Sequence, residues 1–323
     1  MTERRSGRAR ARSRERTVAA LVALAALTGC AKHFVPVTDP ARVRTGAIDA
    51  GQLEASVMQV PVKIMDRVER VKQLFQQAGC GTEYLEVAYN GGTPYPNVIC
   101  TLPGRSRNTI VVGANVDKPA DGNGVIDNWT GAAMLAHLYR SLAVSPREHS
   151  FVFIGFGHVL LNQQGARGYM RRLGADRRDR IRAMVDLKGL GLGATSVWST
   201  QADPNLRMDL VAVAKAIGLP LQSVRFFTNV STDSQVFLYW DIPAITITSF
   251  GMDNARLLAE PYRDRDTSQI DLASYYDTAR LVSLYLAYLD ETLRVREERA
   301  AQAEPQPDSD SDSDSDSEAS EAD

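Results

Sequence analysis

Residues 108–133 read NTIVVGANVDKPADGNGVIDNWTGAA, and the pattern of the rest of the chain is best explained as a scaffold for this stretch. It begins with a β-branched run at 110–112, of the kind that lies buried in a parallel sheet, and small residues end the run. Two carboxylates, Asp117 and Asp127, follow on a glycine-rich loop. A segment from about 131 to 142 then has apolar residues at helical spacing. The stretch therefore predicts a strand, an acidic loop and a helix.

The polar residues of this stretch predict both a helix start and a ligand site. Asn128 and Thr130 are residue types that cap helix N-termini, and we expect them to cap the helix that follows. In an open α/β sheet, ligands bind beyond the carboxyl ends of the strands. Carboxylates placed there favour a cation site.

Length and charge narrow the class of protein. A chain of 323 residues with 44% hydrophobic content can bury a large core, and its alternation of apolar runs and amphipathic stretches indicates one sizeable α/β domain rather than a membrane-spanning bundle. The net charge of −2 hides a segregation: residues 1–29 carry seven Arg and two Glu, and residues 308–323 carry eight acidic residues. The remainder is close to neutral, so nucleic-acid binding is not expected.

The N-terminus has the features of an export signal. An arginine-rich start is followed by the apolar run VAALVALAALTG, which is too short to span a membrane, and we assign residues 1–29 to a signal peptide. Residues 27–30 (LTGC) resemble the bacterial lipobox, which predicts a lipid anchor on Cys30; the alternative is an ordinary signal with a chance cysteine. We expect a location in the cell envelope. If the cell has two membranes, Ala31 favours the periplasmic side of the outer one.

Composition sets the expected domain boundaries. Residues 30–51 contain Pro and Gly and are interpreted as a tether, and residues 52–300 as the α/β domain. Residues 301–323 form an acidic Asp/Ser tail without large apolar residues, which predicts disorder. A solvated linker is favoured for this tail over a cation-binding segment.

Periodicity gives the other elements of the domain. Strands are expected over 83–89, 97–102, 149–157, 181–187, 196–199 and 242–250, and helices over 62–78, 163–173, 205–217, 233–239 and 268–299. Pro61 should break the helical pattern that begins near residue 52. Cys80 precedes the first strand and Cys100 lies in the second. Outside the cytoplasm they could pair in a disulfide, and separate buried thiols are the alternative.

A family resemblance rests on six segments in chain order: TIVVGANVD, GVIDNWTGAA, FVFIGFGHVLLNQQGARGY, MVDLKGLG, TDSQVFLYWDIPAI and YRDRDT. Together they are similar to the co-catalytic di-zinc aminopeptidases of metallopeptidase clan MH, family twenty-eight, over about residues 55–295. The resemblance implies a three-layer α/β/α sandwich with a mixed, mainly parallel central sheet. It also implies a site at the carboxyl ends of the strands.

The family binds two zinc ions through two His, one Glu and two Asp, and uses a second Glu as general base. The resemblance places the first His on Asn115, the bridging Asp on Asp127 and the other Asp on Asp186. Asp117 then corresponds to the carboxylate that orients the first His. Two carboxylate ligands are therefore retained, and one imidazole is replaced by the weaker oxygen donor of Asn115.

At the remaining family positions the residue types can serve neither as the general base nor as the expected Glu and His ligands. The general base falls on Val159, the adjacent Glu ligand on Leu160 and the last His on Tyr262. We therefore expect no cofactor. Three oxygen donors could bind calcium or magnesium weakly, and zinc belongs only to an active alternative that uses Asn115, Asp127 and Asp186, with His158 as a candidate for the lost ligand.

Three basic residues, Lys118, Lys188 and Arg263, stand next to these positions. Lys188 or Arg263 could replace the charge of a lost zinc ion, because crowded carboxylates need a nearby cation; the alternative is that both are ordinary solvated charges. We interpret the chain as a membrane-anchored, non-catalytic aminopeptidase relative that binds a peptide or protein partner. The alternative is an active metallo-aminopeptidase with a rewired one-metal site.

Overall fold

The structure is a computed structural model, and it describes residues 37–89, 94–157, 162–225, 232–251, 253–254 and 256–303. Residues 1–29, Cys30 and the tail beyond Ala303 lie outside the described residues. Within the described ranges, no helix combines the length and the apolar character needed to cross a membrane.

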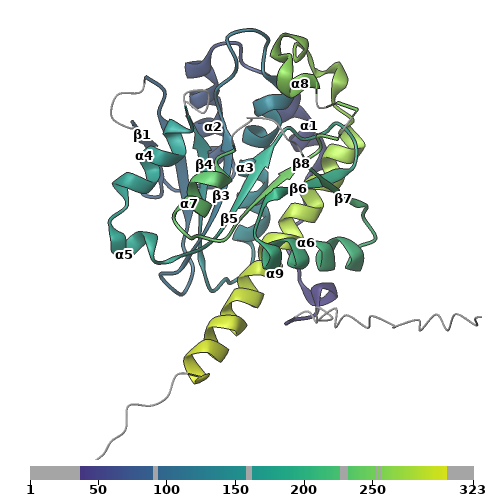
Figure 1. The fold of residues 1–323 in the computed structure, drawn as a ribbon. Helices are drawn as coiled ribbons and strands as arrows, with labels where there is room; N and C mark the ends of the chain where they lie inside the picture. The colour runs from purple at the N-terminus through teal and green to yellow at the C-terminus, as the bar shows by residue number, and fades with distance from the viewer. Residues whose placement is uncertain are drawn as a thin grey trace, which may run out of the picture. The chain divides into compact units, whose positions relative to one another are not determined.

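A mixed sheet of eight strands lies at the centre of the described residues (Figure 1). The strands are β1 (Leu85–Ala88), β2 (Asn97–Leu102), β3 (Thr109–Asn115), β4 (Ser150–Phe156), β5 (Ile181–Lys188), β6 (Thr195–Ala202), β7 (Leu221–Val224) and β8 (Ala244–Thr248). Their order is β1-β2-β4-β3-β5-β8-β6-β7. Strands β4, β3, β5 and β8 are mutually parallel, whereas β1, β2 and β6 run antiparallel to a neighbour. The predicted fold class is confirmed.

Helices cover both faces of the sheet. One face carries α1 (Ala50–Met58), α2 (Ile64–Gln77), α3 (Thr130–Ala143), α6 (Pro204–Ala216) and α9 (Leu272–Ala303), and the other carries α4 (Gln164–Arg172) and α7 (Ser234–Tyr239). Strand β3 shows the alternation: Ile110 and Val112 pack with the first group, and Val111 packs with the second. Both faces are buried, which is why the central strands have continuous apolar runs.

Short helical segments complete the described chain. They are η1 (Pro40–Arg42), η2 (Val125–Trp129), α5 (Ala175–Arg178), α8 (Arg256–Ala259), η3 (Pro261–Arg263) and η4 (Thr267–Gln269). Segment η2 precedes α3 directly, and Asp127 within it leaves helical geometry at φ −113° and ψ 88°. This departure turns the Asp127 backbone at the end of the acidic loop.

The described part of the predicted tether packs on the domain. Val43 and Ile48 are buried, and the Gly46 amide donates to the Ser141 carbonyl at 2.8 Å. Helix α1 then begins at Ala50, before the expected domain boundary at residue 52. The tether interpretation is therefore corrected for residues 37–51, because their few apolar side chains are enough to hold an irregular segment on the core.

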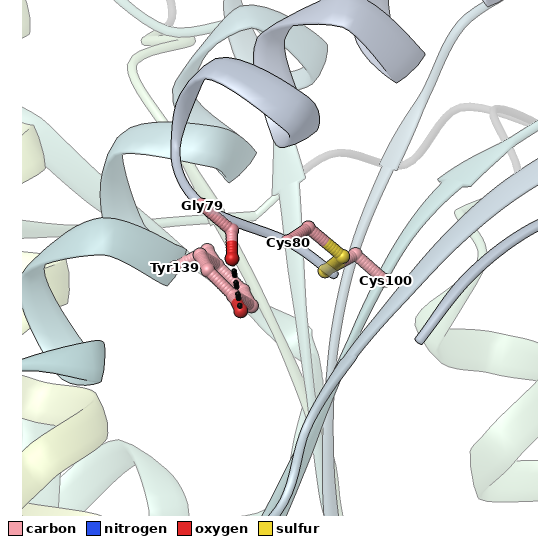
Figure 2. The surroundings of a disulfide bond; sticks show 4 residues. All are labelled: Gly79, Cys80, Cys100 and Tyr139. Carbon is pink, nitrogen blue, oxygen red and sulfur yellow. Dashed lines mark hydrogen bonds between the residues drawn. A yellow bond between two sulfur atoms is a disulfide. The ribbon is translucent and has the colours of Figure 1, made fainter. Parts of the chain in front are cut away.

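A disulfide joins the end of α2 to β2. Cys80 and Cys100 are bonded in the structure, so the pairing was the correct alternative (Figure 2). Beside it, the Tyr139 hydroxyl donates to the Gly79 carbonyl at 3.4 Å, which attaches α3 to the same turn. The bridge closes a loop of 20 residues and so restricts the unfolded chain.

His137 makes the stability of the domain depend on pH. It is 8% exposed on α3, its Nε2 lies 3.0 Å from Ser56 Oγ, and burial together with Arg140 lowers its pKa to about 4. Its stabilising contribution is therefore complete above about pH 6.5 and is lost as the pH falls toward 4. Between pH 7 and pH 5.5 we expect a loss of about 1 kcal/mol in the free energy of unfolding from this group.

Urea unfolding of the unmodified protein and of His137→Gln at both pH values measures this contribution. The substitution keeps a polar side chain but removes the titrating group, so the pH-dependent loss should shrink by about 1 kcal/mol. An equal loss in the two proteins would contradict the assignment to His137.

Candidate functional site

The site lies at the carboxyl edge of the parallel strands. Asn115 is the last residue of β3 and Lys188 is the last residue of β5, and because the two strands are paired in parallel, both ends reach the same edge. The first turn of α3 closes onto this edge through Gly131, where a Cβ would collide with the Leu187 carbonyl oxygen. The small residues of the TGAA segment thus bring the acidic loop against the strand ends.

The loop before α3 is held by a carboxylate from a distant part of the chain. Asp264 Oδ1 accepts from the Val125 amide at 3.0 Å and from the Ile126 amide at 2.8 Å, and Oδ2 accepts from the Asp127 amide at 2.9 Å. Burial raises the pKa of Asp264, and these three amides act against that rise. Asp264 therefore fixes the backbone that carries Asp127.

A buried arginine supports the other side of this loop. Arg67 on α2 is fully buried, donates to the carbonyls of Pro61 at 2.9 Å and Gly124 at 3.0 Å, and also donates to the Asn123 carbonyl. Its guanidinium lies 5.6 Å from the centre of the Trp129 ring. Burial lowers its pKa to about 10, so it remains charged at neutral pH.

Lys188 is ion-paired with the carboxylate of Asp127. Its Nζ lies 2.6 Å from Asp127 Oδ1 and 3.2 Å from Asn128 Oδ1, with 4% of the lysine side chain exposed and 18% of the Asp127 side chain exposed. Burial lowers the pKa of Lys188, but the charge of Asp127 outweighs that effect and the net shift is upward. The position next to Asp127 is therefore occupied by a permanent positive charge.

A buried polar cluster adjoins this pair on the α7 side of the sheet. Asn115 Nδ2 donates to Asp233 Oδ2, and Thr246 Oγ1 donates to Asp186 Oδ2 at 3.3 Å. Ser234 Oγ lies 2.7 Å from Thr246 Oγ1 and continues the network. One oxygen each of Asn115, Asp186 and Asp233 has no hydrogen-bond partner among the described residues.

The two carboxyl groups of this cluster are displaced toward their neutral forms. Burial raises the pKa of Asp186 to about 6, against the opposing charge of Lys188. Burial also raises the pKa of Asp233 well above its usual value, and the charge of Asp186 adds to the rise. Like charges in a dry site cannot both remain ionised, so the pair tends to retain a proton near neutrality.

Comparison of the sequence with protein families places this site in a known context. The sequence model described as "Peptidase family M28" matches residues 97–286, which include both strand ends, the acidic loop and α7. The chain belongs to peptidase family M28. No curated protein sequence matches the chain.

Solved structures share the M28 fold at low sequence identity. LapB from Legionella pneumophila is 16% identical with a TM-score of 0.64, over 75% of this chain and 72% of LapB. BSAP, a zinc aminopeptidase from Bacillus subtilis, is 18% identical with a TM-score of 0.53, over 59% of this chain and 49% of BSAP. A glutaminyl cyclase from Macrostomum lignano is 17% identical with a TM-score of 0.56, over 74% of this chain and 88% of that protein. At such identities these likenesses show the fold alone.

The structure assembles part of the predicted M28 site. Asn115, Asp127 and Asp186, here called the vestigial site, all reach the carboxyl edge, and Asp117 is buried beside it, with its carbonyl accepting from Asn128 Nδ2 at 3.2 Å. The prediction from sequence missed Asp233 and Asp264. Both stand inside segments that resemble the family, TDSQVF and YRDRDT, but neither corresponds to a position in its ligand set.

Two predicted residues lie at the surface instead. Tyr262 is 45% exposed and its hydroxyl donates to Glu260 at 3.0 Å. Arg263 is also exposed, and its guanidinium pairs with the same Glu260. Lys188 rather than Arg263 is thus the basic residue that contacts Asp127. His158, Val159 and Leu160 lie outside the described residues.

The predicted N-cap of α3 was wrong. Thr130 is the first residue of the helix, and its hydroxyl donates to the Ile126 carbonyl at 2.8 Å, while Asn128 contacts Asp117 and Lys188. The reason is that η2 runs directly into α3, so the first amides of α3 follow an existing helical turn and need no side-chain cap. Asn128 binds the strand ends instead, and the Thr130 hydroxyl also accepts from the Leu190 amide just after β5.

These residues do not fit a di-zinc centre. Zinc sites in proteins use imidazole, thiolate and carboxylate donors, whereas the vestigial site offers an amide and two carboxylates, one of which contacts an ammonium group. Among the described residues, no group of three His, Cys, Asp or Glu side chains is placed to hold a metal ion. The unpartnered oxygens of Asn115, Asp186 and Asp233 are donors that a hard cation accepts, but the charge of Lys188 opposes a second cation nearby.

Proposed function

We propose that this chain is a non-catalytic M28 protein of the cell envelope that binds a peptide or protein partner. In this proposal the ammonium of Lys188 replaces the charge of the metal that the family resemblance implies. The fold and the carboxyl edge of the sheet are retained as a binding surface, and the amide of Asn115 stands where an imidazole ligand is expected.

One observation carries this proposal, the contact between Lys188 Nζ and Asp127 Oδ1 at 2.6 Å. The resemblance assigns Asp127 to the bridging position, so this carboxylate would have to bind both metals. An ammonium at hydrogen-bond distance neutralises this carboxylate and occupies one of its two oxygens with a hydrogen bond. A divalent ion there would face the repulsion of a charge that cannot easily leave, because Lys188 is 4% exposed and its pKa is raised.

The envelope location is supported by chemistry elsewhere in the chain. The Cys80–Cys100 disulfide is of a kind that persists in oxidising compartments outside the cytoplasm. The arginine-rich start, the apolar run and the LTGC segment support export and lipidation at Cys30. A double-acylated cysteine anchors a protein stably at a membrane.

Metal content and peptidase turnover test the central claim. The chain from Ala31 onward, without the signal peptide and Cys30, is purified, equilibrated with zinc, desalted and analysed for bound metal, and then assayed with aminoacyl-p-nitroanilides. We expect substoichiometric zinc and no turnover above the buffer rate, because the vestigial site lacks imidazole donors and holds its own cation.

The matched variant is Asp127→Asn, which removes the bridging carboxylate. Turnover that persists in this variant comes from a contaminating peptidase and leaves the proposal standing. Stoichiometric zinc with turnover that is lost in Asp127→Asn would overturn it and establish the active alternative with a rewired site.

A further inference from the structure

A second surface, far along the strands from the vestigial site, is rich in arginine. A groove of about 500 Å³ lies over the sheet at the amino ends of β3, β4 and β5, beside α4 and α5. Thr101, Thr109 and Ser150 form part of its floor. Four arginines line it, Arg107, Arg172, Arg177 and Arg180, and we call it the arginine groove.

The charge of the arginine groove is only partly compensated. Arg172 pairs with Glu86 at 2.7 Å and Arg180 pairs with Asp176 at 2.8 Å. Arg107 and Arg177 are exposed, and their guanidinium groups make no hydrogen bond or ion pair with any described residue. Two cations without a partner among the described residues, above a floor that contains both hydroxyl groups and apolar side chains, favour an anionic ligand with several charges.

The sequence contains a complementary segment. Residues 167–182 carry seven Arg and two Asp, and residues 304–323 carry nine acidic residues and no basic one. The acidic segment alternates Asp and Ser, so an extended chain would present a carboxylate at every second residue. Such a ladder of charges matches a groove lined by several arginines better than a single anion does.

Helix α9, after which the acidic segment begins, reaches the same end of the sheet as this groove but lies on the opposite face. Glu297 on α9 accepts from Arg182 Nε at 2.7 Å and from Asn108 Nδ2 at 3.0 Å, and lies 3.3 Å from His149 Nε2. Each of these three partners is the chain neighbour of a residue that lines the groove, in turn Ile181, Thr109 and Ser150, and because successive strand residues point to opposite faces, Glu297 lies at the same end of the sheet but across it from the groove. Figure 1 shows the last turns of α9 passing this end of the sheet. Helix α9 ends at Ala303, six residues after this contact.

We propose that residues 304–323 bind, as an extended acidic peptide, in the arginine groove of the same chain. An extended chain spans about 3.4 Å per residue, so this segment reaches up to about 70 Å from Ala303 and can return to the groove. Single exposed ion pairs are weak, but a tethered segment acts at an effective concentration in the millimolar range. Several weak pairs then suffice to keep the groove occupied and to exclude other polyanions from it.

The test places a spin label in the acidic segment of the full mature chain. Ser315→Cys carries a nitroxide in a protein with Cys30→Ser, with the Cys80–Cys100 disulfide kept oxidised. We expect the backbone amide signals of Thr101 and Thr109 to lose most of their NMR intensity at low salt. They should recover in about 1 M NaCl, where the Debye length is about 3 Å, and on reduction of the nitroxide with ascorbate.

Paired variants distinguish specific docking from general attraction. Arg107→Ala with Arg177→Ala should restore the signals of Thr101 and Thr109, and neither side chain makes a hydrogen bond or ion pair with a described residue. The control, Arg207→Ala with Arg225→Ala, removes the same charge at α6 and after β7 and should leave the signal loss unchanged. Intact groove signals at low salt, loss confined to another face, or loss that survives in the groove variant would each overturn the proposal.

Discussion

Lys188→Met is expected to lower the free energy of unfolding at neutral pH by about 3 kcal/mol. The substitution keeps most of the buried stem but removes the ammonium group, which leaves the Asp127 carboxylate without its partner at 2.6 Å. It also removes the charge that opposes the upward pKa shift of the buried Asp186. Breaking a buried ion pair on one side costs more than the pair contributes, because the remaining charge stays poorly solvated.

Urea unfolding measures this loss of stability. Two further variants show whether it comes from the broken ion pair. Asp127→Asn in the Lys188→Met background should recover part of the stability, since the unpaired charge is then removed as well. Lys72→Met is the matched control, because Lys72 pairs with Glu69 at 3.1 Å on the surface and such pairs contribute less than about 1 kcal/mol. If Lys188→Met costs no more than Lys72→Met, Lys188 does not serve as the internal cation.

The sequence identified both partners of this ion pair as candidate site residues but did not predict that they contact each other. Lys188 and Asp127 are 61 residues apart, and their side chains meet because β5 pairs in parallel with β3 and because Gly131 lets α3 approach the end of β5. Periodicity located each strand and the helix. It carries no information on how the loop at 116–129 turns, and so the sequence left Lys188 and Arg263 as equal candidates.

The strands that were predicted and the one that was missed differ in burial. Strand β5 is buried along most of its length, and its apolar run AMV at 183–185 is typical of a central parallel strand. Strand β7 (Leu221–Val224) lies at the sheet edge, and only Val224 of its four residues is buried. An edge strand that short has neither alternation nor an apolar run, so pairing with β6 rather than its own sequence defines it.

The sequence also did not predict two polar residues that complete the site. Asp233 and Asp264 come from segments more than 100 residues beyond Asn115 and Asp127, and each acts through a hydrogen bond to a residue of the opening stretch. Their types are common in loops, and nothing in their spacing marks them as buried. The sequence identifies residues that match a known ligand set. The residues that hold the backbone of the site in place are identified only by their contacts in the folded structure.

Arg67→Met is expected to lower the free energy of unfolding by about 4 kcal/mol. Arg67 is fully buried and donates to the carbonyls of Pro61, Asn123 and Gly124, which the methionine side chain cannot replace. Arg67 also provides positive charge near Asp117 and Asp264, and that attraction partly offsets the burial of its own guanidinium. The loss therefore combines unsatisfied carbonyl groups with uncompensated carboxylates.

Arg70→Met is the matched control on the same helix. Arg70 lies three residues further along α2, is half-buried and donates to Gln59 Oε1 at 3.1 Å in an exposed hydrogen bond, so its replacement should lower stability by about 1 kcal/mol or less. Hydrogen exchange gives a second measurement. In Arg67→Met the amides of Val125 and Ile126 should exchange faster than the loss of global stability explains, whereas the exchange rates of amides in the central strands should change only as much as the global stability does. A large stability loss without local opening at these two amides would show that Arg67 supports the core rather than the loop that carries Asp127.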